Sequence, residues 1–266
     1  MIRNFITALQ FLTILTVRKD HTMGEGDLAK SMPYFPLIGF LIGFVLVNAD
    51  RLFSLIALPH TIATFLVIIL SIWITRAIHI DGLADTFDGL MGGRDHSSRL
   101  AIMKDSRLGT AGAIGIVSVL FMKYLCLGNL FESDRITALL IAPLAARWAQ
   151  TLMVFKANYG REQGMGKAFV GHLRSSGLAA ASAVAFGLSA FVIVQLDAHS
   201  MIVRLDARSV MLFFLLVCGA ALLTILGKRY LVSKLGGVTG DAIGAVSELI
   251  EVYVLLLFVM FSSGTS

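Results

Sequence analysis

The second apolar run of the chain reads TIATFLVIILSIWITRAIHI, Thr61–Ile80, and leads directly into DGLADTFDG, Asp81–Gly89. A helix of about 20 apolar residues is long enough to cross the hydrocarbon core of a bilayer, and it satisfies its own backbone hydrogen bonds there. The stretch therefore predicts a transmembrane helix that ends in a block of carboxylates.

The rest of the chain has the same character. Hydrophobic residues form 57% of its 266 residues, the mean hydropathy is +0.83, and the alternating pattern of an outer-membrane barrel is absent. We therefore expect an all-α fold, a polytopic transmembrane helical bundle with about seven spans (range six to eight), as a single integral membrane domain over residues 1–266. Besides Thr61–Ile80, the expected spans are Tyr34–Val47 (to Leu58 if Asp50 and Arg51 lie at an interface), Leu108–Leu130, Ile136–Phe155, Gly177–Leu196, Ser209–Gly227 and Ala242–Ser262.

The N-terminal segment, residues 1–33, is more polar than these runs. Residues 2–17 are short for a span and carry polar interruptions at Arg3, Asn4, Thr7 and Gln10. This pattern is typical of an interfacial or half-inserted helix. We expect residues 1–33 to form an interfacial segment, and whether residues 2–17 cross the membrane stays open.

The basic residues predict an orientation. A net charge of +5 suggests nucleic acid in a soluble protein, but cytoplasmic loops of membrane proteins are also rich in Lys and Arg. Fourteen Lys and Arg fall in one set of alternate segments and four in the loops between them. The basic set is 18–33, 79–107, 156–176 and 228–241, and the opposite set is 49–60, 131–135 and 197–208. We expect the first set to face the cytoplasm, and we expect no nucleic-acid partner.

A cytoplasmic-face motif block at 81–107 begins with three acids. Asp81, Asp85 and Asp88 are spaced i, i+4 and i+7, which places them on one face of a helix. Carboxylates are the oxygen ligands that Mg²⁺ prefers, and three together repel one another without a cation. The alternative is a solvated helix end. We predict all three as metal ligands.

Four bases follow the acids within RDHSSRLAIMKDSRLGTAGA, Arg94–Ala113. Arginine binds phosphate through two parallel hydrogen bonds and lysine acts as a point charge. The alternative is anchoring of a cytoplasmic loop. We predict Arg94, Arg99, Lys104 and Arg107 as substrate-binding residues, with Lys104 and Arg107 also contributing to catalysis.

The third block is GGVTGDAIGAVSELIE, Gly236–Glu251. Its glycines, Gly240 among them, predict a loop whose amides face an anion at a helix N-terminus. Asp241 and Glu248 share a helical face, and acids inside a span mark functional sites. The alternative for Asp241 is capping of the helix N-terminus. For Glu251 the alternative is an ion pair with one of three bases: Arg76, Lys123 or Arg147.

Two weaker features lie near these blocks. NYGREQGMGK, Asn158–Lys167, is a glycine-rich loop that could close over a nucleotide, although it does not satisfy the Walker pattern. His79 and His96 flank the acids, and we interpret both as hydrogen-bonded structural residues.

Three stretches carry a family resemblance: HIDGLADTFDG (79–89), IMKDSRLGTAGA (102–113) and GGVTGDAIGA (236–245). Together they resemble the adenosylcobinamide-GDP ribazoletransferases, also called cobalamin synthases, over nearly the whole chain. The resemblance implies a transferase of the bacterial inner membrane, with its active site facing the cytoplasm. It implies that α-ribazole, or its 5′-phosphate, is joined to adenosylcobinamide-GDP with release of GMP and with Mg²⁺ as cofactor. Other corrinoid-assembly enzymes are possible partners.

The resemblance also implies roles for the motif residues. Mg²⁺ on Asp81, Asp85 and Asp88 would bridge the pyrophosphate, and Lys104 and Arg107 would stabilise developing charge. The ribose 3′-hydroxyl of α-ribazole would attack the phosphorus. Its proton acceptor stays open among three acids: Asp88, Asp241 and Glu248.

Two other functions compete with this assignment. The first block is distantly similar to the CDP-alcohol phosphotransferases, but Asp85 comes one residue early and the arginine of that pattern is missing. An ion-coupled transporter would also place acids and glycines in its spans. The clustering of the acids at one membrane face and the absence of an inverted repeat argue against a transporter.

Overall fold

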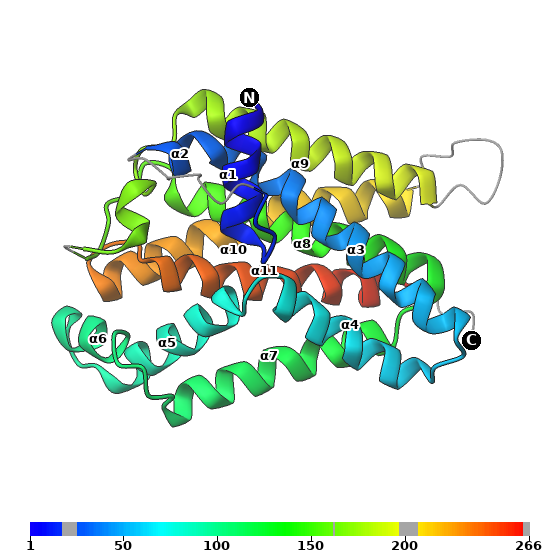
Figure 1. Ribbon diagram of the computed structural model, residues 1–266, viewed down its shortest axis with the longest axis horizontal. Helices are drawn as coiled ribbons and strands as arrows, with labels where there is room; N and C mark the ends of the chain where they lie inside the picture. The colour runs from blue at the N-terminus through cyan, green and yellow to red at the C-terminus, as the bar shows by residue number, and fades with distance from the viewer. Residues whose placement is uncertain (18–25, 162, 197–206, 263–266) are drawn as a thin grey trace.

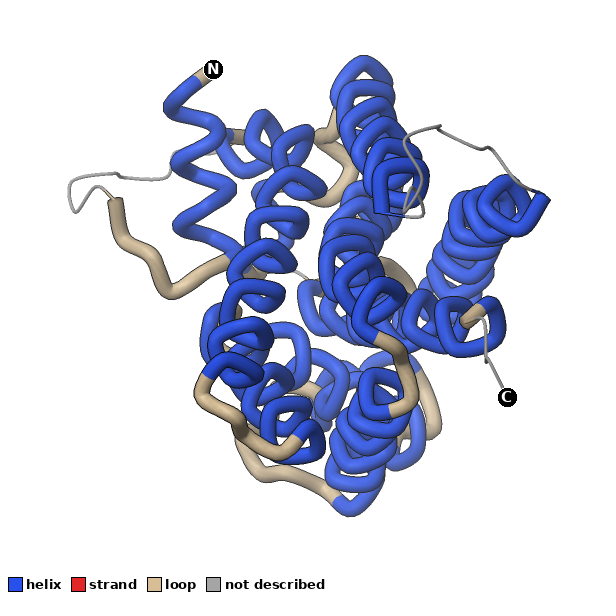
Figure 2. Tube along the Cα trace, turned by 90° about the vertical axis from the view of Figure 1, so that its right-hand side faces the viewer, coloured by secondary structure: helices blue, strands red, loops and turns tan. Residues whose placement is uncertain are grey.

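The computed structural model describes residues 1–17, 26–161, 163–196 and 207–262. Within these residues the secondary structure is helical, with one isolated β-bridge and no strand (Figures 1 and 2). The helices are α1 (Ile2–Leu12), α2 (Asp27–Ser31), η1 (Met32–Tyr34), α3 (Phe35–Leu55), α4 (His60–Ile74), α5 (Ile78–Gly92), α6 (His96–Ile102), α7 (Thr110–Gly128), α8 (Glu132–Val154), η2 (Met165–Ala168), α9 (Ser175–Leu196), α10 (Ala207–Leu235) and α11 (Gly240–Phe261).

The long helices run roughly along the long axis of the molecule (Figure 1). In the described part of the chain, six helical segments are long and apolar enough to cross a membrane, and the bent pair α4–α5 makes a seventh. The all-α, polytopic bundle is thus confirmed. The longer alternative for the first span is the one observed, because α3 continues to Leu55, and α10 is longer than expected, because it continues past Gly227 to Leu235. The extension of α3 includes Asp50, which is neutralised by Arg135 of α8 at 2.7 Å.

The expectation of one helix over Thr61–Ile80 is wrong. The helix α4 ends at Ile74, and α5 begins at Ile78 with its axis turned by 87°. Arg76 and Ala77 have φ angles of 53° and 57°, in the left-handed region that non-glycine residues rarely adopt. The amide of Ile14 donates to the carbonyl of Ile74 at 2.8 Å, so the N-terminal segment satisfies a backbone group at the break.

That N-terminal segment folds back on itself. The helix α1 has 11 residues and is therefore about 16 Å long, roughly half of the hydrocarbon thickness. Near its start, Arg3 forms a 2.8 Å ion pair with Asp27 of α2. The chain thus runs from Arg3 inward to Ile14 and has returned by Asp27, which suits a half-inserted segment. Its interfacial position stays a prediction.

Small residues allow α3 and α8 to pack closely. Gly39 and Gly43 are four residues apart, the spacing at which two helices can approach through their backbones. A Cβ at either position would lie 2.8 Å from a backbone Cα of α8, that of Leu144 for Gly39 and that of Leu140 for Gly43. Larger side chains at the two glycines would therefore separate the helices.

A network of buried charges connects α7, α8 and α11. Lys123 of α7 donates to Glu248 at 2.7 Å and to Glu251 at 2.6 Å, both in α11. Arg147 of α8 donates to Glu251 at 2.9 Å and to Ser247 at 3.1 Å. The two cations neutralise the two anions, so the network is paired within the apolar bundle. The alternative interpretation of Glu251, as the partner of a basic residue, is confirmed.

Removing one charge from this network should destabilise the protein strongly. Lys123→Met leaves an uncompensated buried anion, and we expect a loss of about 3–5 kcal/mol. The double variant Lys123→Met/Glu248→Gln restores neutrality and should unfold at a higher temperature than the single variant. Thermal unfolding in detergent measures both. Equal melting temperatures of the single variant and the unmodified protein would contradict the role of the network.

Candidate active site

The three acids of the first block lie on α5, as their spacing predicts. Asp81 is exposed, and Asp85 and Asp88 are half-buried. Asp85 lies within electrostatic range of three other carboxylates, those of Asp81, Asp88 and Asp241, and of one cation, Arg161. The site therefore carries an excess of negative charge.

Asp88 binds the N-terminus of α7. One of its oxygens accepts from the amide of Gly109 and the other from the amide of Gly112, each at 2.8 Å. A Cβ at either glycine would collide with the Asp88 carboxylate. Gly109 and Gly112 thus leave room for the Asp88 carboxylate, which connects the first sequence block to the second. A carboxylate in this position satisfies amides at a helix N-terminus that have no partner within the helix.

The third block meets the first where α5 crosses α11. A Cβ at Gly82 would lie 2.8 Å from the Cα of Asp241, and a Cβ at Gly244 would lie 3.1 Å from the carbonyl of His79. The close crossing brings Asp241 beside the acids of α5. The alternative interpretation of Asp241, as the cap of α11, is wrong, because the side chain of Thr239 accepts from the amide of Ala242 and is the cap.

Asp241 instead pairs with Arg161, at 2.6 Å. The pairing depends on two loops that meet in an isolated β-bridge between Tyr159 and Val238. Gly160 donates to the carbonyl of Val238 at 3.0 Å, and Val238 donates to that of Asn158 at 2.9 Å. The glycine-rich loop after α8, a weak feature of the sequence, thus contributes a base to the site. Arg161 was not among the predicted site residues, and its position depends on this contact between distant segments.

The four predicted phosphate-binding bases are placed differently. Arg94 and Lys104 are exposed. Arg99 donates to the carbonyl of Lys234 at 3.0 Å, where it stabilises the C-terminal end of α10. Arg107 pairs with Asp105, and the hydrogen bonds of Arg107 lower the pKa of Asp105 to about 2, so the pair is charged at neutral pH. The Arg107 side chain is 88% exposed, so its ion pair with Asp105 contributes little to stability. Arg107 can therefore exchange Asp105 for a substrate phosphate.

The remaining predicted residues are Gly240 and Glu248. Gly240 is the first residue of α11 and lies beside open space, with no atom within 4 Å of an added Cβ. Glu248 is buried in the network with Lys123 rather than facing open space. The roles of both residues stay predictions.

A cavity of about 190 Å³ adjoins the acids. Asp81, Asp241 and Gly240 lie at its wall together with His79 and aromatic side chains. His79 is 5% exposed, and its Nδ1 has no hydrogen-bond partner among the described residues. The Nε2 of His96, in contrast, lies 3.1 Å from the carbonyl oxygen of Ser233, so the interpretation of His96 as a hydrogen-bonded structural residue is confirmed. The interpretation of His79 as a hydrogen-bonded structural residue does not account for its free nitrogen.

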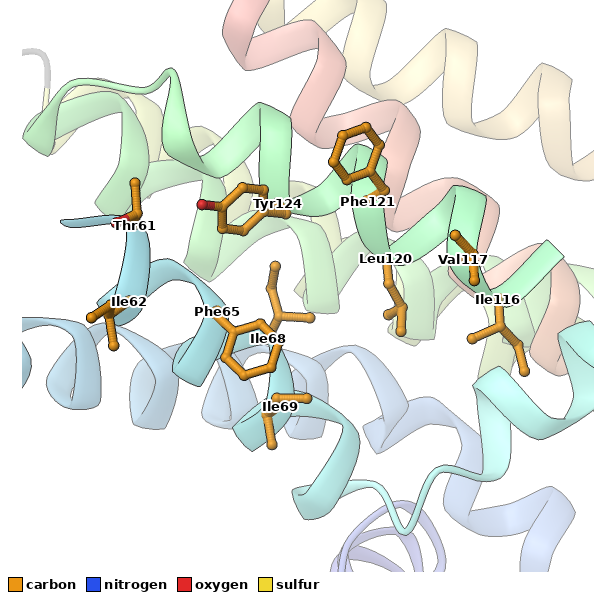
Figure 3. A pocket seen from close by; sticks show the side chains of 10 residues that line it. All are labelled: Thr61, Ile62, Phe65, Ile68, Ile69, Ile116, Val117, Leu120, Phe121 and Tyr124. Atoms are coloured by element: carbon orange, nitrogen blue, oxygen red, sulfur yellow. The ribbon is translucent and has the colours of Figure 1, made fainter. Parts of the chain in front are cut away.

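A second cavity, of about 550 Å³, lies between α4 and α7 (Figure 3). Its walls are the side chains of Thr61, Ile62, Phe65, Ile68, Ile69, Ile116, Val117, Leu120, Phe121 and Tyr124. No charged residue lines it, so it lacks the groups that bind a phosphate or a metal. The candidate active site is therefore the smaller cavity and the acids beside it.

The donor set beside the smaller cavity fits Mg²⁺ only with help from a substrate. Among the described residues, no three His, Cys, Asp or Glu side chains form a group that holds a metal ion by itself. Mg²⁺ commonly uses one or two protein carboxylates and completes its shell with water and substrate phosphates. Asp81 and Asp85 suit that arrangement, whereas both oxygens of Asp88 already accept amide hydrogen bonds. The metal role of all three residues stays a prediction.

The contact of Asp88 with α7 should be important for stability. Asp88→Ala removes two hydrogen bonds to a charged acceptor, and we expect a loss of about 2 kcal/mol or more. Gly112→Ala should also lower the unfolding temperature, because its Cβ collides with Asp88. Gly128→Ala is the matched control in the same helix, since it has open space. Equal unfolding temperatures for the two glycine variants would contradict this account.

Comparison with known proteins shows the family to which the chain belongs. The cobalamin-5-phosphate synthase family matches residues 4–259. An adenosylcobinamide-GDP ribazoletransferase of Geotalea daltonii is 36% identical over 97% of this chain and 98% of its own length. The protein of the same name from Fusobacterium nucleatum is 31% identical over 97% of this chain and 97% of its own length. The one from Alkaliphilus metalliredigens is 34% identical over 98% of this chain and 96% of its own length. No solved structure matches. The resemblance found in the sequence is confirmed, and the chain belongs to the cobalamin-5-phosphate synthase family.

Proposed function

We propose that the protein is an adenosylcobinamide-GDP ribazoletransferase that joins α-ribazole, or its 5′-phosphate, to adenosylcobinamide-GDP and releases GMP. The observation that carries this proposal is the family match over residues 4–259, which includes all three sequence blocks. Asp81 and Asp241 line one cavity, and Asp85 and Arg161 lie within electrostatic range of each other and of Asp241. This grouping supports the proposal, because phosphoryl transfer needs acids and bases around a single reacting phosphorus.

The proposed reaction is an in-line displacement at phosphorus. The ribose 3′-oxygen of α-ribazole forms a bond to the phosphorus on the cobinamide side of the pyrophosphate. The bridging phosphorus–oxygen bond breaks, and GMP leaves with its electron pair. Arg161, Lys104 and Arg107 offer positive charge to the phosphate oxygens.

For the proton of the attacking hydroxyl we propose Asp241 as acceptor. Of the three candidate acids, Asp88 uses both oxygens to bind the amides of α7, and Glu248 is buried in the network with Lys123 and does not line the cavity. Asp241 lies at the cavity wall, where its Oδ2 accepts a hydrogen bond from Arg161. That arrangement supports the choice, because a base must lie within reach of the proton that it removes.

We further propose Mg²⁺ as the cofactor, with Asp81 and Asp85 holding it together with the substrate pyrophosphate. When bound, the metal supplies positive charge that offsets the charge developing on the leaving phosphate. The excess of carboxylates around Asp85 supports a cation at this position. The basic residues at 79–107, 156–176 and 228–241 support a site that faces the cytoplasm of a bacterial inner membrane.

The decisive measurement is release of GMP from adenosylcobinamide-GDP by the full chain in nanodiscs, with and without α-ribazole phosphate. Asp85→Asn and Asp241→Asn should each lower kcat by about 100-fold or more. Glu132→Gln, an exposed acid at the first residue of α8, should leave kcat unchanged and serves as control. Absence of any ribazole-dependent GMP release by the unmodified protein would overturn the function.

Removal of metal gives an independent test of the cofactor. Dialysis against a chelator should abolish GMP release, and added Mg²⁺ should restore it. Full activity after chelation would exclude the metal while leaving the transferase assignment intact. Asp81→Asn should shift the Mg²⁺ concentration for half-maximal activity upward by about tenfold, because one ligand is lost.

A further inference from the structure

The cavity beside Asp81 and Asp241 has an aromatic wall that the proposed chemistry does not use. Phe11 of α1 stacks on Phe35 of α3, with ring centres 5.9 Å apart and planes at 22°. The ring of Phe11 also meets Phe169 edge to face, at 5.9 Å. All three rings line the cavity, and Phe35 and Phe169 are almost fully buried. Such a wall suits a flat, largely apolar ligand.

Two buried polar side chains face the same space. His79 is 5% exposed, and its Nδ1 has no partner among the described residues. Gln150 is 2% exposed and donates its amide nitrogen to Ser247 at 3.1 Å. A buried polar atom without a partner is costly, so the free nitrogen of His79 supports a polar ligand atom as its partner in this cavity.

We propose that this cavity holds the aromatic base of the ribazole substrate. The base lies against the phenyl rings of Phe11 and Phe35, and its unsubstituted ring nitrogen accepts a hydrogen bond from the Nδ1–H of His79. The attached ribose then extends to the cavity wall formed by Asp81 and Asp241, where its hydroxyl reacts. This inference rests on the proposed function, because it assigns one of the two substrates to a particular part of the site.

The polarity of the cavity distinguishes the two bases that the reaction brings together. Guanine carries a carbonyl, an amino group, a ring N–H and further ring nitrogens, all of which need partners when buried. The base of ribazole is a substituted benzimidazole, an apolar bicycle with one free ring nitrogen. Apart from Asp81 and Asp241, which the proposed reaction uses, the wall offers three phenyl rings and two buried polar side chains, which suit the second base better than guanine.

A pair of nearly isosteric variants tests the hydrogen bond. His79→Leu removes it, whereas His79→Asn keeps an amide group near the position of Nδ1. For the full chain in nanodiscs, His79→Leu should raise KM for α-ribazole phosphate by about tenfold and change KM for adenosylcobinamide-GDP much less. His79→Asn should recover most of the loss. The control is His60→Leu, because His60 is exposed at the start of α4 and lies outside the cavity.

Free benzimidazole provides a probe that does not depend on folding of a variant. It should inhibit competitively against α-ribazole phosphate and not against adenosylcobinamide-GDP. If His79→Leu fails to fold, Ile243→Phe fills the same cavity from α11 and should raise the same KM. Unchanged KM for α-ribazole phosphate in the folded Leu variant, or competition of benzimidazole with adenosylcobinamide-GDP, overturns the inference. A wild-type protein that releases no GMP, yet binds α-ribazole in calorimetry through His79, overturns the proposed reaction alone.

Discussion

Gly82 of α5 lies against the backbone of Asp241 in α11, so closely that a Cβ there would be 2.8 Å from the Asp241 Cα. This approach places an acid of the last helix beside the acids of α5. It also depends on the break at Arg76 and Ala77, because a straight continuation of α4 would carry α5 along another direction. The left-handed residues at the break are strained, and strain of this kind persists only where the surrounding contacts determine the conformation. Here the amide of Ile14 supplies one such contact.

The second constraint is that charges inside an apolar bundle must be paired. A neutral network in the described part of the bundle contains Lys123, Arg147, Glu248 and Glu251. Asp50 and Arg135 form a separate pair near the C-terminal end of α3. Paired charges hold the helices in register, since a shift of one turn would separate the partners. The cluster around Asp85 is different, because Asp85 and three further carboxylates oppose one arginine. This difference between balanced and unbalanced clusters distinguishes structural charges from those of the candidate site.

The N-terminal segment contributes both to the helix break and to the cavity beside the acids. Its α1 helix is too short to cross a bilayer, yet α1 supplies Phe11 to the cavity beside the acids, and Ile14, just after α1, binds the helix break. A segment whose composition predicts an interfacial position thus lies against the centre of the bundle. The apolar cavity between α4 and α7 has the opposite character, because its size exceeds that of the site but its walls carry no charged group (Figure 3).

Periodicity and composition in the sequence determined that the protein is a bundle of apolar helices, because each span must satisfy its own backbone hydrogen bonds. The spacing of Asp81, Asp85 and Asp88 determined their common helix, and the motifs identified the family. The sequence did not distinguish the role of Asp88, which binds the amides of α7, from that of Asp85, because both are aspartates on the same face of one helix. Nor did it indicate that Arg161 pairs with Asp241 or that Glu248 pairs with Lys123. These partners are separated by 80 and 125 positions, and their contacts exist only once the helices cross. Only the tertiary structure decided which polar residues satisfy one another and that the Nδ1 of His79 has no partner among the described residues.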